Sequence, residues 1–167
     1  SRGLGDVYKR QTVYNSDKAT VYDKLTETSK GTYQLDEIPA GTYYLRETKA
    51  PQYYNIDNTF YQFTISDAGK IVDVSINGND KFPNAPQKGD IKIVKRSADG
   101  VLSGWQFRVT GTAKTGQSYD KTFTTDAKGT ITISNIRIGD YKVTEVKTGK
   151  TVGYITENSK DLEVKTD

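Results

Sequence analysis

The sequence contains no cysteine, no histidine and no methionine. These absences exclude thiol nucleophiles, imidazole bases, disulfide bonds and the common zinc sites. A small domain with a limited core usually needs a disulfide, a metal or another crosslink to stay folded. A chain without cysteine therefore raises the question of what stabilises it in place of a disulfide.

Long apolar runs are also absent. No segment approaches the ~20 apolar residues that a membrane span needs, so we expect no membrane insertion. Residues 1–11, SRGLGDVYKRQ, lack the apolar stretch of a secretory signal. Within them, DVYKRQ resembles the translation of a sequencing adapter derived from a transposon. We therefore expect residues 1–11 to be a non-native leader or a disordered terminus.

The chain has little excess charge of either sign. Its net charge is +3, and residues 1–11 supply +2 of this from three basic residues and one acidic residue. Elsewhere lysines alternate with acids and form no basic stripe, so we expect no nucleic-acid partner. The sequence also lacks three catalytic or cofactor-binding motifs: the phosphate-binding glycine loop, the dinucleotide-binding glycine motif and the serine nucleophile elbow. We therefore expect neither turnover catalysis nor a cofactor.

No helical periodicity persists in the sequence. Nearly every ordered segment alternates apolar and polar residues at period two, and the turn formers Gly, Asn and Asp recur between these segments. This pattern predicts an all-β, antiparallel fold with little or no helix. We interpret Asp99, Asp126 and residues 77–80 as turns rather than metal sites, because they lack the carboxylate spacing of a calcium loop.

One pattern occurs twice. Residues 31–47 read GTYQLDEIPAGTYYLRE and residues 129–145 read GTITISNIRIGDYKVTE, an offset of 129 − 31 = 98. Each copy reads as a strand, a turn and a second strand that ends in glutamate. We predict two homologous domains: a first module over residues 12–85, a short linker over 86–88, and a second module over 89–167.

The two glutamates stand in phase with apolar residues. In the strand 141–145, Tyr141, Val143 and Glu145 share one face. The first copy repeats this arrangement and ends at Glu47. Both copies place a carboxylate in core phase at the same position, and chance does not readily explain this repetition. We therefore predict that both glutamates point inward.

A lysine stands in core phase on the opening strand of the second module, which we predict over residues 90–95. Lys95 shares its face with Ile91 and Ile93. Burying a lone ammonium or a lone carboxylate is costly, so inward Lys95 and Glu145 imply each other. The pair is either a buried salt bridge or a reactive pair, because a neutral amine is a nucleophile and a protonated carboxyl polarises a neighbouring amide.

An asparagine as third member would complete such a reactive site. Lysine and asparagine side chains would then yield an isopeptide bond and ammonia. Asn84, in phase with Phe82 near the end of the first module, is the candidate amide.

Several segments resemble Cna B-type domains. Residues 41–51, GTYYLRETKAP, and the later Tyr54 resemble the family signature G-x-Y-x-L-x-E-x-x-A-P-x-G-Y, with Gln52-Tyr53 departing from it. The second module carries similar segments at 89–95, 104–107 and 139–145. The resemblance implies two tandem Ig-like, prealbumin-like β-sandwiches of the SpaA-like pilin type. It also implies an extracellular, cell-wall-anchored adhesin or pilin of a Gram-positive bacterium, whose partners are neighbouring domains of the same surface protein.

The resemblance further implies a role for each candidate residue. Lys95 corresponds to the amine and Glu145 to the acid of the second module, while Glu47 and Asn84 correspond to the acid and the amide donor of the first. By this comparison the first module lacks its opening, lysine-bearing strand and the second lacks its last, asparagine-bearing strand. We therefore expect isopeptide bonds in the full-length protein rather than within these 167 residues.

Alternatives remain open at each of these points. Glu47 and Glu145 could also be ordinary hydrogen-bonded or edge-exposed glutamates. Lys95 could lie at an exposed strand end, since a bulge shifts the phase by one residue, and Asn84 could be a turn residue beside proline. Nine of the twelve tyrosines lie in residues 1–85. An exposed row of them, such as Tyr44 and Tyr53, would fit a glycan- or host-protein-binding adhesin module, although tyrosine is also a common strand residue. An accessory β-sandwich domain of a secreted enzyme is the third class.

Overall fold

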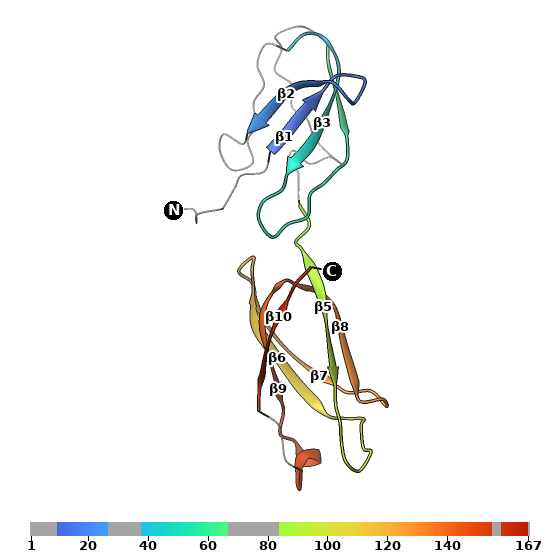
Figure 1. The fold of residues 1–167 in the computed structure, drawn as a ribbon, viewed down its shortest axis with the longest axis vertical. Helices are drawn as coiled ribbons and strands as arrows, with labels where there is room; N and C mark the ends of the chain where they lie inside the picture. The colour runs from blue at the N-terminus through green and yellow to red at the C-terminus, as the bar shows by residue number, and fades with distance from the viewer. Residues whose placement is uncertain (1–9, 27–37, 67–83, 155–157, 167) are drawn as a thin grey trace. The chain divides into compact units, whose positions relative to one another are not determined.

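A computed structural model describes residues 10–26, 38–66, 84–154 and 158–166. The chain divides into two compact units, Ser1–Ala85 and Pro86–Asp167, which hold the first and the second module (Figure 1). The strand β5 begins at Lys88, the last residue of the predicted linker. In the described ranges no helix is long and apolar enough to cross a membrane.

The first module contains one antiparallel sheet in the order β2-β1-β3-β4. Its strands are β1 (Arg10–Tyr14), β2 (Val21–Thr26), β3 (Gly41–Lys49) and β4 (Tyr61–Ile65). On β3 the burial alternates with the pleat, and the buried apolar side chains join one core cluster. That cluster consists of Val13, Ile38, Tyr43, Leu45 and Ile65.

Strand β1 includes two residues that the sequence analysis placed before the first module. Arg10 and Gln11 fell within the predicted leader, yet both belong to β1, and Gln11 pairs with Glu47 on β3. Its side chain is buried at 1% exposure. Residues 10 and 11 are therefore part of the sheet, while residues 1–9 lie outside the described ranges, and the non-native origin of residues 1–11 stays a prediction.

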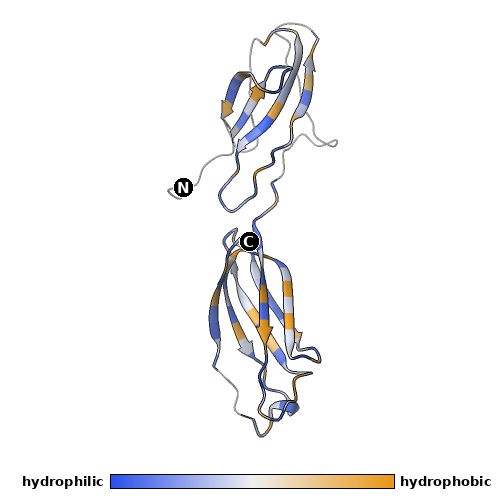
Figure 2. Ribbon diagram, turned by 45° about the vertical axis from the view of Figure 1, so that its right-hand side comes forward, coloured by the Kyte–Doolittle hydropathy of each residue, from blue (hydrophilic) through white to orange (hydrophobic). Residues whose placement is uncertain are grey.

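The second module is a sandwich of two sheets, with strand orders β10-β9-β6-β7 and β5-β8. Its elements are β5 (Lys88–Val94), β6 (Gln106–Ala113), β7 (Ser118–Thr124), β8 (Thr130–Arg137), β9 (Gly139–Glu145), the short 3₁₀ helix η1 (Gly149–Thr151) and β10 (Lys160–Val164). Isoleucines of β5 and β8 pack against Val109, Tyr141 and Val164 of the other sheet in one core. Apolar bands alternate with polar ones along these strands in Figure 2, as a half-buried sheet requires.

The internal repeat is visible in the strand pairing. The order β2-β1-β3-β4 of the first module matches β7-β6-β9-β10 of the second. Val13 on β1 pairs with Leu45 on β3, and Val109 on β6 pairs with Val143 on β9. Val13 and Val109 are fully buried. The predictions of an all-β fold and of a duplicated unit are confirmed.

A tyrosine hydroxyl anchors the second strand of each repeat at its start. Tyr43 donates to the backbone oxygen of Pro39 at 2.8 Å, and Tyr141 donates to that of Arg137 at 2.6 Å. Burial is the main cause that raises the pKa of both hydroxyls. The neighbouring Tyr22 raises the pKa of Tyr43 further, and Tyr119 raises that of Tyr141. Both anchors therefore stay protonated, and donating, at neutral pH.

The predicted turns use their carboxylates for backbone contacts. Asp126 Oδ1 accepts from the amides of Lys128 and Thr130 at 2.9 Å each, and Gly129 follows at φ 78°. Asp99 Oδ1 accepts from the Val101 amide at 3.0 Å. In the described ranges no group of three acidic side chains is placed to hold a metal ion. Residues 77–80 lie outside these ranges.

Candidate functional site

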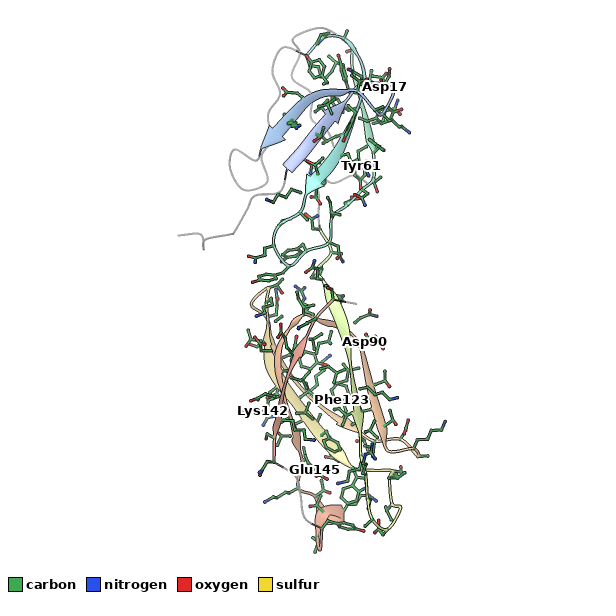
Figure 3. The ribbon with its side chains drawn as sticks, viewed as in Figure 1. Asp17, Tyr61, Asp90, Phe123, Lys142 and Glu145 are labelled. Carbon is green, nitrogen blue, oxygen red and sulfur yellow. The ribbon has the colours of Figure 1, made fainter. Side chains whose placement is uncertain are left out.

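The second module brings Lys95 and Glu145 together. Lys95 directly follows β5, and Glu145 ends β9 in the opposite sheet, near η1 (Figure 3). Lys95 Nζ donates to Glu145 Oε1 at 3.0 Å, and the two side chains are only 12% and 3% exposed. Both point inward, as their strand phase predicted, although the chemical roles assigned to them stay predictions.

An aromatic ring covers the Lys95 amine. The Nζ atom lies 4.3 Å from the centre of the Trp105 ring, a distance at which a cation is attracted to the aromatic face. Trp105 is 1% exposed, and its indole N–H donates to the backbone oxygen of Val101 at 2.7 Å. The amine is therefore held between a carboxylate and an apolar surface, with little access for water.

Tyr154 helps to hold this tryptophan in place. Its ring meets the Trp105 ring edge-on, with the centroids 4.9 Å apart, and its hydroxyl donates to Asp99 Oδ2. Hydrogen bonds from Ser97, then Tyr154 and the Val101 amide, lower the pKa of Asp99 to about 2. Asp99 is therefore an ionised acceptor over the physiological pH range.

A cavity adjoins the Lys95–Glu145 pair. Its volume is about 370 Å³ and it lies along residues of β5 and β10. Among the described strands, β5 pairs with β8 alone and β10 with β9 alone, so the other edge of each is open here. The pair thus lies beside a recess that an additional side chain or segment can enter.

The first module brings Glu47 and Asn84 together. Glu47 is 4% exposed, and its Oε1 accepts from Asn84 Nδ2 at 2.5 Å and from the Asp57 amide at 3.0 Å. Asn84 Nδ2 also donates to the backbone oxygen of Asn55 at 3.0 Å. Asn84 lies outside the described strands, and Phe82, its predicted phase partner, lies outside the described ranges.

Each module therefore places its glutamate beside one of the two partners that the resemblance implies. The second module shows the amine and the acid, and the first shows the acid and the amide. The glutamates occupy equivalent positions, because β6 pairs Phe107 with Glu145 and β1 pairs Gln11 with Glu47.

Sequence reasoning missed Gln11 because it assigned this residue to the leader. Its amide nitrogen is buried and, among the residues that the structure describes, has no hydrogen-bond partner. The equivalent position in the second module holds the apolar Phe107. Period-two phase with Val13 is the signal that would have found it.

Replacing Gln11 with leucine is expected to stabilise the first module by about 1–3 kcal/mol, because the buried donor without an acceptor is removed. Urea denaturation followed by far-ultraviolet circular dichroism measures the change. Gln62→Leu, on an exposed position of β4, is the matched control and should leave the midpoint nearly unchanged. A lower midpoint for Gln11→Leu would mean that the Gln11 amide stabilises the fold.

The tyrosine row does not form an open platform at Tyr44. This side chain is half-buried, and the Lys18 ammonium lies 4.7 Å from the centre of its ring. Phe60 meets the same ring edge-on at 6.2 Å. Tyr53 is half-buried in a turn at φ 71°. Glycan binding at these residues stays a prediction.

The two antiparallel modules with a shared strand order define the chain as a tandem prealbumin-like β protein. A family model described as the SpaA prealbumin-like fold domain matches residues 9–80 and 89–167. The chain belongs to this family. No curated protein matches the sequence.

Two solved structures share the fold at low sequence identity. The Bacillus anthracis TIE protein is 22% identical with a TM-score of 0.67, over 97% of this chain and 28% of TIE. The C-terminal fragment of pilus adhesin SpaC from Lactobacillus rhamnosus GG is 17% identical with a TM-score of 0.53, over 96% of this chain and 75% of the fragment. The chain thus spans less than a third of the length of TIE.

Proposed function

We propose that the chain is a structural stalk segment of a cell-wall-anchored adhesin or pilin on a Gram-positive bacterium, stabilised in the full-length protein by Lys–Asn isopeptide bonds. Membership of the SpaA prealbumin-like family and the fold shared with a pilus adhesin fragment support the surface role. The observation that carries the crosslinking chemistry is the buried contact between Lys95 and Glu145.

The chemistry needs a neutral amine and a polarised amide. One proton passes from Lys95 Nζ to the Glu145 carboxylate along their hydrogen bond. The freed amine then attacks the side-chain carbonyl carbon of an asparagine, while the protonated glutamate hydrogen-bonds to that carbonyl. As the carbon–nitrogen bond of the amide breaks, its nitrogen takes the proton from the glutamate, which is regenerated as a carboxylate. The lysine nitrogen loses a second proton when it becomes the amide N–H, and this proton leaves with the ammonia as ammonium, so each site reacts once.

In the first module, Glu47 takes the part of the acid and Asn84 that of the amide donor. The contact between Asn84 Nδ2 and Glu47 Oε1 supports this assignment. The nitrogen that becomes ammonia lies against the carboxyl group that must protonate it. The lysine is proposed to come from an opening strand equivalent to β5 of the second module.

Such bonds would answer the question that the missing cysteines raise. A covalent tie between the first and the last strand of a sandwich restricts the unfolded chain as a disulfide does. It is also independent of redox conditions. A stalk domain that carries tension between a cell and its target gains most from a tie of this kind.

Mass spectrometry of the full-length protein from its natural host tests the proposal. Each isopeptide bond removes ammonia, about 17 Da, and joins two proteolytic peptides. We expect crosslinked peptides that contain Lys95 and Asn84, and loss of the Lys95 link in Glu145→Ala. Glu163→Ala, an exposed glutamate on β10, should retain both links. An uncrosslinked Lys95 and Asn84 in the mature protein would refute the proposed chemistry.

A further inference from the structure

Asn158 lines the cavity beside the Lys95–Glu145 pair. The pairing of β10 with β9 places Lys160 opposite Val143 and Asp161 opposite Lys142. The same register, continued two residues before β10, places Asn158 opposite Glu145. A hydrogen bond of 2.8 Å between the hydroxyls of Thr144 and Ser159 supports this continuation.

The continued register also indicates which face of the sheet carries the Asn158 side chain. Residues directly opposite each other in an antiparallel pair share one face of the sheet, with Cβ atoms about 5 Å apart. Glu145 faces inward toward Lys95, so the continued register places the exposed Asn158 on the same face, at the rim of the module.

The cavity beside the pair supports the same placement. Asn158 lines it together with Lys95 and Glu145. Among the described residues that line this cavity, Asn158 is the sole carboxamide. Asp161 also lines it, but pairs opposite Lys142 and so has the opposite phase on β10.

We propose that Asn158 is an amide donor for Lys95, so that the second module closes its own crosslink within this chain. This inference rests on the proposed function and changes the third member of the site. Lys95 Nζ bonds to the side-chain carbonyl carbon of Asn158, the bond from that carbon to Nδ2 breaks, and Nδ2 leaves as ammonia. Glu145 accepts the amine proton and passes it to the leaving nitrogen.

The resulting bond joins the two sheets of the sandwich. Lys95 extends from the end of β5, and Asn158 precedes β10 in the opposite sheet. The tie closes the chain from residue 95 to residue 158, and the amine needs no strand from outside the sequence.

The intact mass of the 167-residue protein tests this inference. We expect a deficit of about 17 Da from the sequence mass and a crosslinked peptide pair that contains Lys95 and Asn158. Asn158→Ala and Lys95→Arg should both restore the full mass. Asn158→Asp should instead lose water, about 18 Da, because an acid replaces the amide. Asn58→Ala, at an exposed position of the first module, is the matched control and should keep the deficit.

Two results would overturn the assignment and leave the proposed function standing. The first is a deficit that persists in Asn158→Ala but disappears in Glu145→Ala, which would assign the amide to another residue. The second is a wild-type chain at full mass, while the full-length protein carries the Lys95 crosslink to another strand. An uncrosslinked Lys95 in the full-length protein would overturn both proposals.

Discussion

In the Asn158→Ala background, in which Lys95 keeps its ammonium, replacing Glu145 with alanine is expected to lower the free energy of unfolding of the second module by about 3–5 kcal/mol, because removal of one partner leaves a buried charge without compensation. The Lys95 ammonium is then enclosed by Trp105 and the core, with its carboxylate gone. The chain has a single tryptophan, so its fluorescence during urea denaturation reports on the second module alone.

Two further variants separate the charge effect from a packing effect. Lys95→Met combined with Glu145→Leu replaces the pair by apolar side chains of similar length and should recover most of the loss. Asp120→Ala breaks the exposed pair between Arg108 and Asp120, whose side chains are 54% and 55% exposed, and should cost less than about 1 kcal/mol. An effect of Glu145→Ala as small as that of Asp120→Ala would show that Lys95 does not depend on the carboxylate.

Strand phase was sufficient to predict which side of the sheet each glutamate faces. A pleated strand sends alternate side chains to opposite faces, so Tyr141 and Val143 locate Glu145 without any tertiary information. The duplicated pattern made the same prediction for Glu47. Both are buried in the structure, as are Tyr43, Leu45 and Tyr141, while Val143 is partly buried.

Phase does not show what lies across the sandwich. The cover that Trp105 provides for Lys95 depends on the turn before β6, and the position of Asn158 depends on how a loop of about a dozen residues returns the chain to β9. Neither distance follows from period-two alternation. The tertiary pairing of strands determines both, and a single sequence gives no direct measure of it.

The strand position of Gln11 was not predicted, for a related reason. The likeness of residues 6–11 to a sequencing adapter placed Gln11 in a leader, but its pairing with Glu47 makes it part of a strand. Its polar side chain gave no hydrophobic signal, and the cost of burying it becomes visible only when the opposite strand is known. Only the phase that it shares with Val13 pointed to the interior.

Trp105→Ala is expected to lower the free energy of unfolding of the second module by about 3–5 kcal/mol, as truncation of a fully buried large aromatic side chain generally does. The side chain fills space beneath the loops that carry Val101 and Tyr154, and its loss also leaves the Val101 carbonyl without the indole donor. Because this variant has no tryptophan, thermal unfolding by calorimetry is the measurement. Val152→Ala, at a position that is 78% exposed, is the control and should change the free energy by less than about 0.5 kcal/mol.

Trp105 and Lys95 should also be coupled, since the amine lies over the indole ring. A double-mutant cycle with Trp105→Ala and Lys95→Met, made in the Asn158→Ala background so that Lys95 keeps its charge, isolates their interaction from the loss of packing. A coupling of about 1–2 kcal/mol is expected for a desolvated cation–π contact. A coupling near zero would mean that the ring only fills space. A clear coupling would mean that it holds the amine against Glu145, in which case Trp105→Ala should also reduce the yield of any Lys95 crosslink.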